Sequence, residues 1–128
     1  SFDINKPGEF AKIDPADFTI MFEILEHIPG PEELLKEAYD KSAKGVLFSF
    51  PNTGFITHRA RLLFGKFPLQ WAKHPGEHLR FWTYTDLKWW LKAQGYRRYK
   101  IHTYVGVPFL KDVWPSMFAA GFFVEIKK

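Results

Sequence analysis

Three titratable side chains follow directly on one apolar segment. Glu23, Glu26 and His27 lie within five positions, immediately after the run from Phe18 to Phe22. The run shows no alternation of polar and apolar residues, which predicts a parallel strand covered on both faces by helices. Ligands of open α/β sheets bind at the carboxyl ends of the strands, and a histidine there can accept a proton near neutral pH. The pattern predicts acid/base chemistry on a substrate hydroxyl or amine, with helix capping by Glu26 and His27 as the alternative.

A second candidate, His78, lies between Glu77 and Arg80 in a loop before an expected helix. It could face the same cleft as His27, although a loop histidine is more often structural. The two histidines are too far apart in the sequence for a local zinc pattern, and the chain has no cysteine, so the spacing predicts no metal site. Acyl-transfer hydrolysis has no support either, because the sequence has no Gly-x-Ser-x-Gly motif and no Ser-His-Asp order.

Two further segments have both a functional and a structural interpretation. Asn52 follows a second apolar strand and could offer its amide to a ligand, but an Asx turn is the simpler prediction. Residues 57–73 are basic and amphipathic, which suits a membrane surface or an acidic partner. For this second segment we favour a lid helix over the cleft.

Composition limits the class of protein. Of the 128 residues, 46% are apolar and 19% aromatic, which is enough for one core. The net charge is +4, but the cations are scattered, so we do not expect nucleic acid as a partner. The absence of cysteine fits a cytoplasmic protein. No apolar run approaches the roughly 18 residues that span a bilayer, so we expect no membrane span.

The elements that must position these residues follow from periodicity and capping signals. Strands are expected at 17–25, 46–50, 97–105 and 118–126, the last antiparallel to its neighbours. Helices are expected from 31 to a stop at Gly45, at about 56–64, and at 84–94. Thr83 and Asp86 have the spacing of a capping box for the last helix, which Gly95 would end. This order predicts an α/β fold with a mostly parallel sheet and one antiparallel strand.

Taken together, several segments resemble class I S-adenosylmethionine-dependent methyltransferases. These segments are FTIMFEILEHI (18–28), PEELLKE (31–37), VLFSFPN (46–52), HLRFWTYTDL (78–87) and LKAQGY (91–96). Within that family, SFPN (49–52) followed by RARLLFGKFP (59–68) is similar to the MetW-like branch of methyltransferase types 11 and 12, named for methionine biosynthesis. The resemblance covers nearly the whole chain. It implies a Rossmann-like methyltransferase sheet of seven strands, of which this chain matches the last four.

The roles that the resemblance implies are limited to matching residues. Asp3 would contact the adenine of S-adenosylmethionine. Phe22 and Glu23 would lie beside the methionine part of this cofactor. His27 and His78 would face the methyl acceptor as catalytic residues.

The resemblance leaves two functions open. In the first, residues 1–128 are the C-terminal part of a single methyltransferase-like domain, whose first strands and glycine loop are absent from this chain, and the protein methylates an unidentified small molecule. In the second, the protein is a non-catalytic, methyltransferase-like regulator of methionine biosynthesis that acts through protein contacts, in the way attributed to MetW-like proteins and a homoserine acyltransferase. In both, the strand at 17–25 has an open edge, which we expect a missing N-terminal half or a partner chain to cover.

Overall fold

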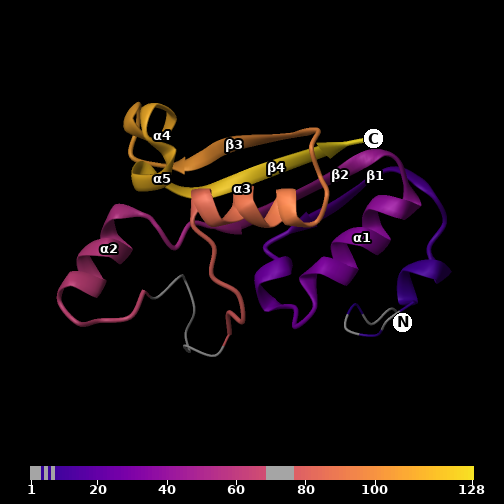
Figure 1. The fold of residues 1–128 in the computed structure, drawn as a ribbon, viewed down its shortest axis with the longest axis horizontal. Coiled ribbons are helices and arrows are strands. Elements are labelled where there is room, and N and C mark those ends of the chain that lie inside the picture. Colours follow the sequence, from indigo (N-terminus) through magenta and orange to yellow (C-terminus); the bar gives the residue numbers. More distant parts are fainter. Residues whose placement is uncertain (1–3, 5, 7, 69–76) are drawn as a thin grey trace.

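A four-stranded mixed sheet with helices on one face forms the body of the protein (Figure 1). The computed structural model describes residues 4, 6, 8–68 and 77–128. The strands are β1 (Ala16–Phe22), β2 (Ser42–Pro51), β3 (Tyr99–Gly106) and β4 (Ala119–Lys127). The longer helices are α1 (Pro31–Lys41), α2 (Ile56–Leu63) and α3 (Tyr84–Ala93). The shorter turns are η1 (Glu9–Lys12), η2 (Leu25–His27), α4 (Leu110–Val113) and α5 (Pro115–Phe118).

The strand order is β1-β2-β4-β3, and the predicted single sheet with its last strand antiparallel to its neighbours is confirmed. β1 and β2 are parallel, and β4 lies between β2 and β3 and is antiparallel to both. Three strands therefore share one direction, and the last strand of the chain runs against them. The carboxyl ends of β1 and β2 consequently meet at one edge of the sheet, beside the end of β3 and the start of β4.

The core lies between one face of the sheet and the helices α1 and α3. Phe48, Phe50 and Phe122 are fully buried on this face and pack with apolar residues of both helices. The α3 capping box is present as predicted, and a hydrogen bond of 2.7 Å from Trp90 Nε1 to Glu32 Oε1 joins α3 to α1. These contacts hold the helices in place beneath the sheet (Figure 1).

The opposite face of β1 is not covered by the described residues. Phe18, Ile20 and Phe22 are 38%, 58% and 50% exposed, whereas Met21, which points to the core, is 2% exposed. The prediction of a strand covered on both faces by helices is therefore wrong for the described part of the chain. An unbroken apolar run indicates that both faces are apolar, but it does not show which segment covers each of them.

Gly45 has a different role from the one predicted. Helix α1 already ends at Lys41, and Gly45 lies inside β2 with a φ of 149°. A Cβ atom at this position would lie 2.0 Å from the carbonyl oxygen of Ile126 on β4. The glycine is required by the close approach of two strands, and the helix instead stops where the Ser42 hydroxyl donates to the Ala38 carbonyl at 2.7 Å.

Helix α2 projects from the end of β2 and buries none of its residues (Figure 1). Leu63 and Phe64, near its end, are 82% and 77% exposed. The lid helix that we favoured for residues 57–73 stays a prediction. Residues 69–73 lie outside the described residues, and the described part does not line the cavity at the end of β1.

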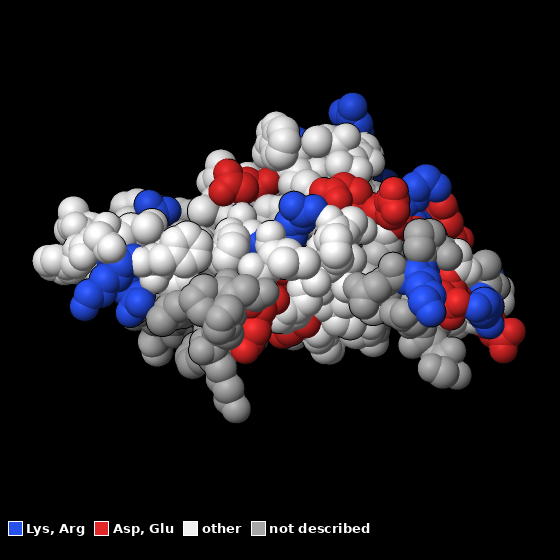
Figure 2. Space-filling model, turned by 90° about the horizontal axis from the view of Figure 1, so that it is seen from below, with Lys and Arg blue, Asp and Glu red and all other residues white. Residues whose placement is uncertain are grey.

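Charged residues of both signs are scattered over the face in Figure 2. None of the helices that the structure describes is long and apolar enough to cross a bilayer.

Candidate functional site

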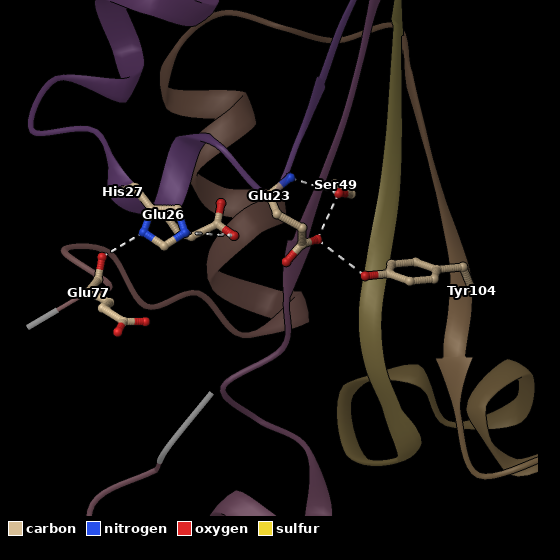
Figure 3. Close-up of polar contacts among 6 residues, drawn as sticks. All are labelled: Glu23, Glu26, His27, Ser49, Glu77 and Tyr104. Atoms are coloured by element: carbon tan, nitrogen blue, oxygen red, sulfur yellow. Dashed lines mark hydrogen bonds and ion pairs between the residues drawn. The ribbon is translucent and has the colours of Figure 1, made fainter. Parts of the chain in front are cut away.

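A cavity of about 420 Å³ lies at the carboxyl end of β1. It is lined by Glu23, His27, Pro51, Glu77, His78, Tyr104, Val105 and Ala120. The predicted meeting of His27, His78 and Glu23 in one cleft is thus confirmed. Figure 3 shows the polar contacts on two sides of this site, one around Glu23 and the other around His27.

Glu23 is held in an unusual backbone conformation. Its φ of 50° lies in the left-handed region, which costs energy for a residue other than glycine. Its N–H donates to Ser49 Oγ at 3.1 Å, and the Ser49 hydroxyl donates back to Glu23 Oε1 at 2.7 Å. The Tyr104 hydroxyl donates to the same oxygen at 3.2 Å, and burial together with Glu23 raises the pKa of Tyr104 to about 12. Side chains from β2 and β3 therefore fix the carboxylate at the end of β1.

Hydrogen bonds on either side of His78 connect its loop to the turn η2. The carbonyl of Glu26 accepts from Leu79 N at 2.8 Å and from Arg80 N at 3.1 Å. On the other side, His27 Nδ1 lies 2.6 Å from the carbonyl oxygen of Glu77. A carbonyl only accepts, so Nδ1 carries the hydrogen and donates it, and the other ring nitrogen, Nε2, faces Glu26.

The two imidazoles lie against each other. The ring centroids of His27 and His78 are 4.6 Å apart, with an angle of 79° between the ring planes. Burial, and secondly the neighbouring His27, lower the pKa of His78 below its ordinary value. His78 is therefore neutral at physiological pH and can act as an acceptor or as a ligand.

Glu26 lies beneath the imidazoles and is almost fully buried. It is 1% exposed, and its Oε1 lies 4.0 Å from His27 Nε2. In the described part of the chain, no donor reaches either carboxylate oxygen. Burial is the main cause that raises the pKa of Glu26 to about 8, and the neighbouring Glu23 carboxylate adds to this effect. Two carboxyl groups and two imidazoles in one place can exchange a proton with a ligand or hold a cation.

The other residues that the sequence pointed to do not line the cavity. Phe22 directly precedes the cavity residue Glu23, and its ring lies 5.1 Å from that of Phe123. Asp3 lies outside the described residues. Asn52 is fully buried, and its Nδ2 donates to the Ala119 carbonyl at 2.6 Å while its Oδ1 accepts from Gly54 N at 2.9 Å. The Asx turn is confirmed, and the amide is used within the fold.

Sequence reasoning missed Ser49 and Tyr104 as parts of the site. Ser49 pairs directly with Phe22 across β1 and β2, so aligning the two strand ends would have pointed to it. Tyr104 reaches Glu23 only because β4 lies between β2 and β3 and brings β3 close to the site. No local pattern around Tyr104 contains this information.

Comparisons with known proteins give a consistent picture. The family described as a methyltransferase domain matches residues 2–101. No curated protein matches the chain significantly. Three solved structures share the fold. An S-adenosylmethionine-dependent methyltransferase from Archaeoglobus fulgidus is 18% identical with a TM-score of 0.62. The Thermotoga maritima enzyme described as a possible histamine N-methyltransferase is 16% identical with a TM-score of 0.60, and the small RNA methyltransferase HEN1 is 21% identical with a TM-score of 0.61.

The structural matches cover most of this chain but a smaller share of the chains that it matches. The chain is covered over 96%, 88% and 93% of its length in the Archaeoglobus, Thermotoga and HEN1 structures. It spans 65%, 56% and 15% of those chains in turn. At these identities the structural matches establish the fold, a Rossmann-like methyltransferase sheet.

Proposed function

This chain belongs to the methyltransferase domain family, and we propose that it takes part in the transfer of a methyl group from S-adenosylmethionine to a small-molecule acceptor. The observation that carries the proposal is the convergence of Glu23, His27 and His78 on one cavity, with the buried Glu26 beside the two histidines. That cavity lies at the carboxyl end of β1, where open α/β sheets bind their ligands.

The residues proposed for the cofactor fit that role in part. Phe22 offers a half-exposed aromatic ring at the end of β1. The two hydroxyl donors of Glu23 both use Oε1, so Oε2 can accept from a hydroxyl or ammonium group of a ligand. Asp3 would complete this set. When bound, S-adenosylmethionine supplies the methyl group, and Phe22 and Glu23 would orient the cofactor.

We assign the acceptor side of the cavity to His27 and His78. Both rings line the cavity, and hydrogen bonds to backbone groups fix the loops that carry them. Such groups can position a hydroxyl or amine of the acceptor and take up the proton that it loses.

The proposal extends to the architecture of the whole protein. Residues 1–128 would be the C-terminal part of a single methyltransferase-like domain, and a preceding N-terminal half or a partner chain would cover β1. The support for this is the exposed apolar face of β1, where Ile20 is 58% exposed. β1 is also an edge strand of the described sheet, and an unpaired edge and an exposed apolar face both favour association with another segment.

The finer assignments rest on the sequence alone. We keep the MetW-like branch as part of the proposal because of segments 49–52 and 59–68. A cytoplasmic location belongs to the same proposal. The non-catalytic alternative has no support among the matches, which are described as methyltransferases.

Labelled methyl transfer tests this function. The full-length protein is incubated with a small-molecule extract and S-adenosylmethionine carrying a deuterated methyl group, and the products are read by mass spectrometry. We expect at least one small molecule to gain the labelled methyl group with the wild-type protein and to lose most of this signal with His27→Ala. A product that forms equally with heat-denatured protein, or no product, would contradict the proposal.

A further inference from the structure

The least satisfied polar group among the described residues is the Glu26 carboxylate. Burial removes it from water, yet neither of its oxygens accepts a hydrogen bond from the described chain. Buried carboxylates are normally paired with a donor, a cation or a metal ion. The neighbouring Glu23 carboxylate repels a negative charge on Glu26, which makes the position less favourable still.

The groups around Glu26 are metal ligands by type. One carboxylate oxygen of Glu26 and one ring nitrogen each of His27 and His78 lie within 4.8 Å of one another. Ligands that share one ion at about 2.0–2.2 Å lie roughly 3–4 Å apart, so small side-chain rotations would complete the set. A single general base would need only one imidazole, whereas two imidazoles facing a buried carboxylate suit a cation between them.

The orientation of His27 matches that of a ligand (Figure 3). Its Nδ1–H is donated to the Glu77 carbonyl at 2.6 Å, and this leaves Nε2 directed toward Glu26. A hydrogen bond from the far ring nitrogen to a backbone carbonyl is the usual outer support of a metal-bound histidine, because it fixes the tautomer and the ring plane. The backbone bonds to Leu79 and Arg80 hold the loop of His78 in a corresponding way.

We propose that Glu26, His27 and His78 bind one divalent transition-metal ion. Two imidazole nitrogens and one carboxylate oxygen favour ions between Mn²⁺ and Zn²⁺ over Mg²⁺ or Ca²⁺, which prefer oxygen ligands throughout. Three protein ligands leave coordination positions open toward the cavity, as in catalytic metal sites. The spacing in the sequence predicted no metal site, but the fold brings together ligands from the turn η2 and from the loop before α3.

The proposal does not depend on methyl transfer, so its test uses metal ions alone. Full-length protein without an affinity tag is stripped with a chelator and titrated separately with Mn²⁺ and Zn²⁺ by calorimetry. A third titration with Co²⁺ is followed by visible absorption, which reports nitrogen and oxygen ligands directly. We expect saturable binding of one ion per chain with at least one of these metals.

Variants locate the site. Glu26→Gln keeps the shape of the side chain and should weaken binding at least 10-fold, and His78→Ala should weaken it at least as much. His58→Ala is the matched control, because this histidine lies on α2 and does not line the cavity. Its affinity should equal that of the wild type.

Circular dichroism without metal shows whether each variant is folded. If His78→Ala does not fold, the metal affinity of Glu26→Gln alone tests the proposed site. No saturable binding of any of the three ions by the wild type would overturn the proposal. Binding by folded Glu26→Gln with wild-type affinity would also overturn it.

Discussion

The imidazoles of His27 and His78 meet edge to face, with ring centroids 4.6 Å apart, although they come from loops that are distant in the sequence. The contact arises because the loop before α3 donates two backbone hydrogen bonds to the Glu26 carbonyl and accepts one from the His27 ring at the Glu77 carbonyl. Both loops end up at the carboxyl edge of the sheet. The pair lies where we propose the acceptor side of the candidate site.

Removal of either imidazole should reduce methyl transfer while the fold stays intact. His27→Ala or His78→Ala should lower turnover by about 10²- to 10⁴-fold, the range for a group that assists proton transfer. Steady-state rates with the acceptor found by labelling give the measurement, and His58→Ala is the control. Unchanged turnover in both variants would leave the two histidines with a purely structural role.

Gly45 should tolerate no side chain. Gly45→Ala places Cβ 2.0 Å from the Ile126 carbonyl oxygen at a φ of 149°, and the strands would have to separate. We expect a loss of about 3 kcal/mol or more in the free energy of unfolding. Gly65 is the matched control, because its φ is also positive and a Cβ atom added there would meet nothing within 4 Å, so Gly65→Ala should cost only about 1 kcal/mol. Urea unfolding curves measure both, and equal losses would contradict the role given to Gly45.

The exposed face of β1 gives a test of its proposed cover. If a preceding segment or a partner chain lies on Ile20, Ile20→Lys would bury a charge and cost about 2–4 kcal/mol in the full-length protein. Leu63→Lys on α2 is the control, since Leu63 is 82% exposed and its replacement should change stability by less than about 0.5 kcal/mol. Thermal or urea unfolding compares the two, and an equally small effect at Ile20 would mean that this face is open to solvent.

His58 should make the protein sensitive to mild acid. Partial burial, and secondly Arg61, lower the pKa of His58 below its ordinary value, so the folded state binds this proton less readily than the unfolded chain. Above the unfolded pKa of about 6.5, His58 is neutral in both states and has no effect on the free energy of unfolding. Below that pH the unfolded chain takes up the proton more readily, so the free energy of unfolding falls. The difference in unfolding free energy between pH 7.5 and pH 5 should be smaller in His58→Ala than in the wild type. An identical pH dependence in both would contradict this assignment.

Much of the fold could be predicted because local signals and tertiary structure agree. The capping box at Thr83, the proline at the start of α1 and the β3–β4 pairing were all read from the sequence and are confirmed. Gly45 was misassigned because a glycine shortly after a helical pattern usually ends the helix. Position 45 requires a glycine because of the nearby Ile126 carbonyl, which lies on a strand near the end of the chain.

The site could be predicted only where its residues follow a strand directly. Glu23, Glu26 and His27 were found in this way, because a strand end is a local feature. Tyr104 could not be, because its contact with Glu23 depends on the insertion of β4 beside β2. The missing partner of Glu26 is likewise visible only when burial and geometry are known.

Calorimetry with S-adenosylmethionine tests the central claim most directly. The full-length protein should bind the cofactor saturably, one molecule per chain. Residues 1–128 by themselves should bind at least roughly a thousandfold more weakly, because three charge-assisted hydrogen bonds of about 1.5–3 kcal/mol each would be missing. No binding by the full-length protein would contradict methyl transfer and favour the non-catalytic alternative. Tight binding by residues 1–128 alone would contradict the assignment of this chain as part of a larger domain.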